Sequence, residues 1–227
     1  MKNMVVRDDA SAELVAALGE SASKTPFPPD VRQFRTYLSW AWWVGLAFFS
    51  VYPTTNWLAS LRSSPFHVYV PAELEIPFVP QFVWGYLSMY VLFVMPPFFL
   101  HAAQLPVLGK QLIAGTLVSG LLFLLLPAEL GFVRTVPADP PYAGIYAAMF
   151  GVDRPYNLIP SLHVVFSAAI ALACADVARP AARAGLRCWL ALIAVSTIFV
   201  HQHHVLDVTA AFVLVFLLRR RYEVTHA

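Results

Sequence analysis

Charged residues are scarce in this chain of 227 residues, and cysteines are scarcer still. Asp, Glu, Lys and Arg make up 12% of the sequence, whereas hydrophobic residues make up 59%. A soluble domain of this length rarely has such a composition, so we expect a single-domain integral membrane protein. The two cysteines lack the spacing of a metal site or of a disulfide framework. A net charge of +2, without a stripe of basic and aromatic residues, argues against nucleic acid as a partner.

Long apolar runs occupy most of the chain. An apolar helix of about 20 residues crosses a bilayer. The runs therefore predict an all-α fold, an integral membrane bundle of six transmembrane helices at residues 37–56, 80–100, 107–127, 160–178, 187–202 and 204–219. A long outer loop, residues 128–159, separates the third and fourth helices. We expect residues 1–36 to form a cytoplasmic segment, 37–221 the membrane catalytic domain and 222–227 a cytoplasmic tail.

Basic residues close to the ends of these runs predict the orientation. Most of them fall on one side of a six-helix arrangement: Arg32, Arg35, Lys110, Arg179, Arg183, Arg187, Arg219, Arg220 and Arg221. Three fall on the other side: Arg62, Arg134 and Arg154. The positive-inside rule then places both termini in the cytoplasm, as in a bacterial inner membrane protein whose opposite face is periplasmic.

The outer loop contains polar residues that could meet a ligand, namely Arg134, Arg154 and Asn157. Long loops in compact bundles often carry function. Within this loop, residues 142–150 are apolar enough to form a short helix in the membrane interface. A loop that only caps the bundle is the alternative interpretation.

Two short histidine segments flank apolar runs, at Pro160-Ser161-Leu162-His163 and at His203-His204-Val205-Leu206-Asp207. The 40 positions between His163 and His203 allow one pass down and one pass back, which returns the chain to the same face. On a helix, Asp207 would lie on the same face as His203 and could orient its ring. Pro160 suits the first turn of a helix whose N–H groups would attract a phosphate. These residues predict a catalytic site at the outer mouth of the bundle.

The order Asn157, Pro160-Ser161-x-His163, then Ser196-Thr197-x5-His203-x3-Asp207 resembles the type 2 phosphatidic acid phosphatase superfamily. The resemblance covers roughly residues 80–219. It implies that His203 is a nucleophile that takes the phosphoryl group and that Asp207 orients it. It also implies that His163 protonates the departing alcohol and that Ser161 helps to hold the phosphate. The implied substrate is a lipid phosphate or pyrophosphate, and the implied chemistry needs no metal or other cofactor.

The chain departs from the family pattern in two places. The first motif requires a lysine seven residues before an Arg-Pro pair, but Ala147 stands there before Arg154-Pro155. The third motif usually begins Ser-Arg, whereas this chain has Ser196-Thr197. Another cation must then stabilise the phosphoryl group, and we prefer Arg134 over Arg154. The missing arginine resembles the branch that contains inositol phosphorylceramide synthases, so transfer of a phospho-head group to another alcohol is the alternative reaction.

Other interpretations stay open at this point. His201, His203, His204 and Asp207 contain the ligand types of a zinc site, although the Pro-Ser-Leu-His segment would then have no role. A non-catalytic membrane scaffold or transporter is a further possibility, because the first-motif cations are absent. His201 and His204 flank the proposed nucleophile and should point elsewhere if the segment is helical, which favours a non-catalytic role.

Overall fold

The computed structural model describes residues 28–62, 66–152 and 154–223, and these residues are mainly helical. The expected all-α class is confirmed. A pair of two-residue parallel strands, β1 (Phe66–His67) and β2 (Ala128–Glu129), joins two loops. The helical elements are α2 (Val31–Ser60), η1 (Pro71–Glu75), η2 (Pro80–Phe82), α3 (Val83–Leu87), α4 (Met89–Val94), α5 (Pro96–Phe99), α6 (Leu105–Leu125), α7 (Tyr142–Val152), α8 (Leu162–Val177), α9 (Pro180–Phe199) and α10 (Val205–Glu223).

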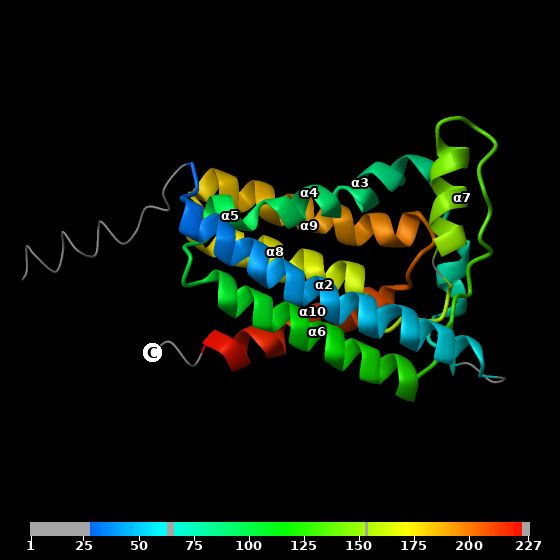
Figure 1. Cartoon of the computed structure of the whole chain (residues 1–227). Helices are drawn as coiled ribbons and strands as arrows, with labels where there is room; N and C mark the ends of the chain where they lie inside the picture. Colours follow the sequence, from blue (N-terminus) through cyan, green and yellow to red (C-terminus); the bar gives the residue numbers. More distant parts are fainter. Residues whose placement is uncertain (1–27, 63–65, 153, 224–227) are drawn as a thin grey trace, which may run out of the picture.

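The long helices run side by side, and α7 lies across one end of them (Figure 1). Helix α8 is the centre of the bundle, since it contacts α4, α5, α6, α9 and α10. Its buried face contains the small residues Ala168, Ala171 and Ala175, which let neighbouring helices approach closely. Helix α2 begins and α10 ends at the end of the bundle opposite to α7 (Figure 1). The α9–α10 turn and the start of α8 therefore lie at the α7 end.

The second expected helix, residues 80–100, is not continuous. It consists of η2, α3, α4 and α5, with breaks at Ser88 and Met95. Pro96 and Pro97 have no N–H to donate, so the hydrogen-bond ladder of α4 cannot continue through them. Near the first break, a Cβ on Gly85 would lie 2.3 Å from Ser196 Oγ. A glycine is required there because α3 packs directly on α9.

Several helix ends differ from the predicted ones. Helix α2 begins at Val31 rather than at 37, because the side chain of Asp30 accepts a hydrogen bond from the N–H of Gln33 at 2.6 Å and caps the helix. Helix α8 begins at Leu162, so Pro160 precedes the helix and does not occupy its first turn. Residues 1–27 of the expected N-terminal segment and 224–227 of the expected tail lie outside the described residues. The expected short helix in the outer loop is confirmed as α7.

Apolar side chains cover much of the outside of the bundle. Trp42 and Phe49 of α2 are 71% and 73% exposed, and Leu121 of α6 and Phe216 of α10 are more than half exposed. Within the described residues, α6 and α9 are the helices whose length and composition would let them cross a membrane.

Candidate functional site

A cavity of about 840 Å³ lies between α2 and the helices α3 to α6 and α8. His163 and His203 both line it, although His163 belongs to α8 and His203 to the turn between α9 and α10. The two imidazoles are close enough to interact electrostatically. The structure thus brings together the two histidines that the sequence pairs, at the α7 end of the bundle.

His163 is the second residue of α8 and is half-buried. Its Nε2 donates a hydrogen bond to the carbonyl oxygen of Tyr86 at 2.8 Å, because a carbonyl can only accept. The Tyr86 ring stacks on the imidazole with 3.9 Å between centroids. Tyr86 therefore fixes the ring of His163, and Nδ1 is the nitrogen that remains for a proton transfer.

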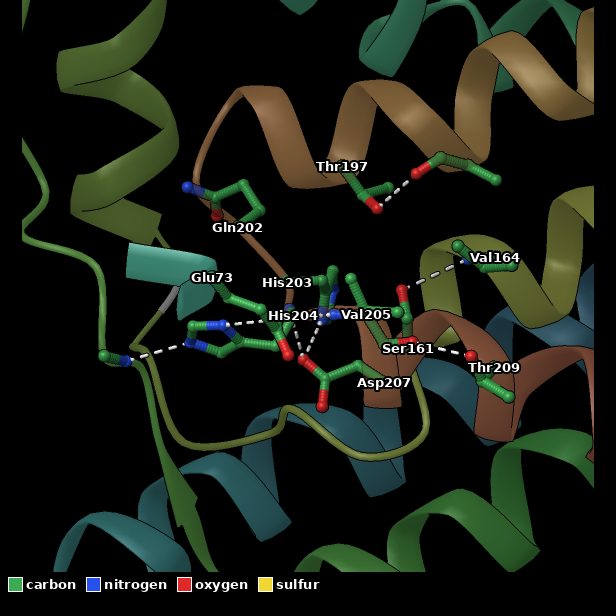
Figure 2. Close-up of polar contacts among 12 residues, drawn as sticks. Glu73, Ser161, Val164, Thr197, Gln202, His203, His204, Val205, Asp207 and Thr209 are labelled. Atoms are coloured by element: carbon green, nitrogen blue, oxygen red, sulfur yellow. Dashed lines mark hydrogen bonds and ion pairs between the residues drawn. The ribbon is translucent and has the colours of Figure 1, made fainter. Parts of the chain in front are cut away.

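Asp207 holds His203 from the first turn of α10. Asp207 Oδ2 lies 3.3 Å from His203 Nδ1 and accepts the backbone N–H of His204 at 2.8 Å (Figure 2). The second contact is the backbone half of a capping box, in which an acidic side chain reaches back over the start of its helix. His203 precedes α10, so the predicted pairing is present but does not arise from a shared helix face. The Asp207 carboxylate contacts Nδ1 of His203 and does not contact Nε2.

Ser161 joins the start of α8 to α10. Its side chain caps α8 by accepting from the N–H of Val164 at 3.3 Å, and its own N–H donates to the carbonyl of Asp207 at 3.1 Å. Ser161 is fully buried and is not among the residues that line the cavity. Its visible role is to fix the start of α8 beside Asp207.

Glu73 is a residue of the site that the sequence did not reveal. Its Oε2 accepts the backbone N–H of Val205 at 2.9 Å and lies 3.2 Å from His204 Nδ1 (Figure 2). His204 Nε2 accepts the N–H of Gly131 at 3.1 Å, so His204 is neutral and its Nδ1–H donates to Glu73. Burial lowers the pKa of His204, and this effect is larger than the opposite effect of the nearby Asp207 and Glu73 carboxylates, which raise it. Glu73 and His204 together anchor the start of α10 to η1 and to the loop that contains Gly131.

His201 contacts residues other than Asp207. Its backbone is left-handed, with φ of 55°, and its Nε2 donates to the carbonyl of Ile76 at 2.9 Å. Its ring stacks on Phe132 with 3.9 Å between centroids. Burial lowers the pKa of His201. The strained turn at His201 reverses the chain between α9 and α10.

The outer-loop cations occupy different places. Arg154 lines the cavity, and its Nη1 donates to Ser60 Oγ at 2.9 Å. Arg134 is not among the lining residues; its Nη2 donates to Gln202 Oε1 at 3.2 Å, and its guanidinium lies over the Phe150 ring. The structure therefore places Arg154, and not the preferred Arg134, on the cavity wall. Arg134 contacts Gln202, which lines the cavity.

Two amides complete the polar end of the cavity. Asn157 is buried, and its Nδ2 donates to Tyr52 O at 2.9 Å and to Thr55 Oγ1 at 3.0 Å, which ties the outer loop to α2. Its Oδ1 has no hydrogen-bond partner among the described residues. The same holds for Nε2 of Gln202, which is 4% exposed. Both residues line the cavity, but these two atoms are themselves buried.

A zinc site of His201, His203, His204 and Asp207 does not form. The rings of His201 and His204 are held by Ile76, Glu73 and Gly131, as described above. Across residues 28–62, 66–152 and 154–223, no group of three or more His, Cys, Asp or Glu side chains is arranged to hold a metal ion.

No family model matches this chain, and neither a curated protein nor a solved structure is significantly similar to it.

Proposed function

We propose that the protein is an integral membrane phosphatase that hydrolyses a lipid phosphate or pyrophosphate through a phosphohistidine intermediate. The observation that carries this proposal is the single cavity lined by His163 and His203, with the Asp207 carboxylate against His203 Nδ1. The motif resemblance described above supports the same assignment of roles.

The membrane setting rests on the outer surface and on the distribution of charge. Large apolar side chains point outward from α2, α6, α9 and α10, where a soluble bundle would expose polar ones. We place six membrane-crossing rods in the bilayer: α2, the broken rod of α3 to α5, α6, α8, α9 and α10. The positive-inside rule then puts the cavity mouth at the outer face of a bacterial inner membrane, with both termini in the cytoplasm.

In the first half-reaction, Nε2 of His203 attacks phosphorus and the bond between phosphorus and the alcohol oxygen breaks. Asp207 keeps the proton on Nδ1, so that the lone pair of Nε2 is available to attack. Protonated His163 gives its Nδ1 proton to the departing alkoxide, which leaves as the lipid alcohol. The products of this step are phosphohistidine at 203 and neutral His163.

In the second half-reaction, neutral His163 takes a proton from the incoming water. The water oxygen attacks phosphorus, the bond between phosphorus and nitrogen breaks, and inorganic phosphate leaves. His163 is protonated again, and His203 is again neutral. If an alcohol replaces water in this step, the same residues give the alternative reaction, transfer to a second lipid.

Charge on the phosphoryl oxygens meets several donors. Helix α8 presents its N-terminus beside His163, and helix N-termini favour anions. Arg154 supplies a cation on the cavity wall. These groups take the place of the absent first-motif cations.

The test offers purified protein in detergent a panel of phosphatidate, diacylglycerol pyrophosphate, isoprenyl pyrophosphate and phosphoinositide. We expect free phosphate from at least one lipid, and a loss of turnover in His203→Ala and in His163→Ala. His101→Ala is the matched control, because His101 lies between α5 and α6 at the other end of the bundle (Figure 1). A labelled head group in a new lipid would assign the transfer reaction, and no product from any lipid would overturn the proposal.

A further inference from the structure

The broken rod of α3 to α5 is interrupted beside the point where it contacts His163. Helix α3 ends at Leu87 and α4 begins at Met89. The last four C=O groups of an α-helix receive no N–H from within that helix. The carbonyl of Tyr86 is one of these four, and it accepts the Nε2–H of His163 at 2.8 Å. The break therefore makes a backbone acceptor available beside His163.

Ser88 maintains this break with its side chain. Its Oγ donates a hydrogen bond to the carbonyl of Gly85 at 2.6 Å. In a continuous helix that carbonyl would accept the N–H of Met89, four residues further on. A serine hydroxyl that bonds to the nearby backbone competes with helix formation. The side chain of Ser88 therefore favours two short helices over one continuous helix.

Helix α9 holds the break from the other side. Trp189 is half-buried, and its Nε1 donates to Ser88 Oγ at 2.8 Å, so the hydroxyl accepts one hydrogen bond and donates another. Helix α3 lies along α9, and Gly85 packs directly on Ser196 (Figure 1). The same helix leads into the turn that carries His203. One helix thus sets the position of the acceptor for His163 relative to His203.

The acid step needs this acceptor. His163 gives its Nδ1 proton to the departing alkoxide and later takes a proton from water on the same nitrogen. A carbonyl oxygen accepts and never donates, so it keeps the other proton on Nε2 in both states of the ring. Without this acceptor, the neutral ring can carry its proton on either nitrogen. The tautomer with the proton on Nδ1 cannot accept from water at that position.

We propose that Ser88 and Trp189 are positioning residues for the acid step, and that they hold the break between α3 and α4 so that the carbonyl of Tyr86 accepts the Nε2–H of His163. The inference rests on the proposed function, because it assigns that step to His163. Neither Ser88 nor Trp189 is among the residues that line the cavity. Two side chains outside the cavity therefore control its acid.

Substitutions of Ser88 separate this role from packing alone. Ser88→Ala removes the hydroxyl and introduces the best helix former, so that α3 and α4 can join and the Tyr86 carbonyl can turn to the N–H of Tyr90. Ser88→Gly removes the same hydroxyl, but glycine is a poor helix former and preserves the break. Ser88→Thr keeps the hydroxyl. We expect the largest loss for Ala, a smaller one for Gly and the smallest for Thr, whereas packing alone predicts a larger loss for Gly than for Ala.

The experiment compares two leaving groups in detergent. Ser88→Ala should lower kcat for an alkyl phosphate by about tenfold, because a hydrogen bond that holds the acid is lost. It should leave the first-turnover release of nitrophenol from a nitrophenyl phosphate within about twofold, because this leaving group departs without a proton. Trp189→Phe removes the donor but keeps an aromatic ring, and it should lose about threefold with the same selectivity.

Two matched controls should keep wild-type rates with both substrates. Thr36→Ala removes a hydroxyl that bonds only within α2, to the carbonyl of Arg32, at the end of the bundle opposite to α7 (Figure 1). Trp43→Phe changes a tryptophan that is 53% exposed. An equal loss of Ser88→Ala with both leaving groups, or a larger loss in Ser88→Gly than in Ser88→Ala, would overturn the inference while the proposed phosphatase activity stands.

A spectroscopic readout separates this inference from the activity itself. The nitrogen NMR shifts of the His163 ring, assigned by comparison with His163→Gln, report which nitrogen carries the proton in the neutral form. We expect the proton on Nε2 in the wild type and partly on Nδ1 in Ser88→Ala. An unchanged tautomer in Ser88→Ala would overturn the inference even if its activity falls. The expected change in a protein that turns over no lipid phosphate would refute the phosphatase instead.

Discussion

One oxygen of Asp207 accepts two hydrogen bonds, and this makes Asp207→Asn an informative substitution. Oδ2 faces His203 Nδ1 at 3.3 Å and the N–H of His204 at 2.8 Å, whereas Oδ1 is buried without a hydrogen-bond partner among the described residues. The amide oxygen of asparagine can occupy the Oδ2 position and keep both bonds. The amide NH₂ group then occupies the Oδ1 position. The substitution should therefore preserve the tautomer of His203 and remove only the negative charge beside it.

The expected loss follows from these two bonds. A hydrogen bond to a charged group contributes about 1.5–3 kcal/mol and a neutral one about 0.5–1.5 kcal/mol. The difference of about 1–1.5 kcal/mol lowers kcat by roughly five- to fifteenfold. Asp207→Ala removes the acceptor from both His203 and the start of α10. By analogy with breaking a buried ion pair, that should cost about 3 kcal/mol or more, which is a loss of at least about a hundredfold.

The assay measures kcat for phosphate release by both variants, alongside their melting temperatures in detergent. We expect Asp207→Asn to keep a measurable rate and Asp207→Ala to lose nearly all of it. An Asn variant as inactive as the Ala variant would refute the reasoning about the shared oxygen. Wild-type rates in both would remove Asp207 from the site.

Three further predictions follow from the site. His163→Ala should lower turnover of an alkyl phosphate by about a hundredfold or more, yet spare the first, single-turnover release of nitrophenol from a nitrophenyl substrate, since only the later attack of water then needs His163; an equal loss in both would contradict the acid role. Arg154→Ala should raise KM for the lipid by about tenfold, and Arg154→Lys by less, because Arg154 lines the cavity. Arg134→Ala should raise KM less, since Arg134 contacts Gln202; a larger effect than that of Arg154→Ala would reverse the assignment. Burial lowers the pKa of His204 below its ordinary 6.5. As the pH falls below 6.5, His204 is therefore protonated in the unfolded chain before it is protonated in the folded chain, which favours unfolding. Stability should therefore be highest above about pH 6.5 and decline below it, and His204→Gln should decline less over the same range, as melting temperatures would record; an equal decline in the variant would refute this.

The sequence predicted the helical class because that class depends on long apolar runs, and such runs can be recognised from the order of the residues alone. It missed the breaks in residues 80–100, even though Pro96 and Pro97 mark one of them. The break at Ser88 depends on α3 packing against α9 through Gly85 and Ser196, which are far apart in the sequence. Contacts of this kind leave no periodic signal.

The pairing of His163 with His203 was predictable because it depends only on the 40 positions between them, which let two successive helices return the chain to the same end of the bundle. The part played by Glu73 was not predictable, since its partners His204 and Val205 lie more than 130 positions away and Glu73 belongs to no motif. Asp207 was assigned the correct partner on an incorrect geometric ground, because α10 begins after His203. The difference between Arg154 and Arg134 depends on how the outer loop folds over α2, which the composition of the loop does not encode.

The most direct test of the account is to trap the covalent intermediate. Protein mixed with a labelled lipid phosphate is quenched in alkali, which preserves phosphohistidine, and the labelled residue is identified by mass spectrometry. We predict a phosphoryl group on His203 that is absent from His203→Ala and that accumulates in His163→Ala when the substrate has a good leaving group. Label on any other residue, or turnover without label on His203, would contradict the account.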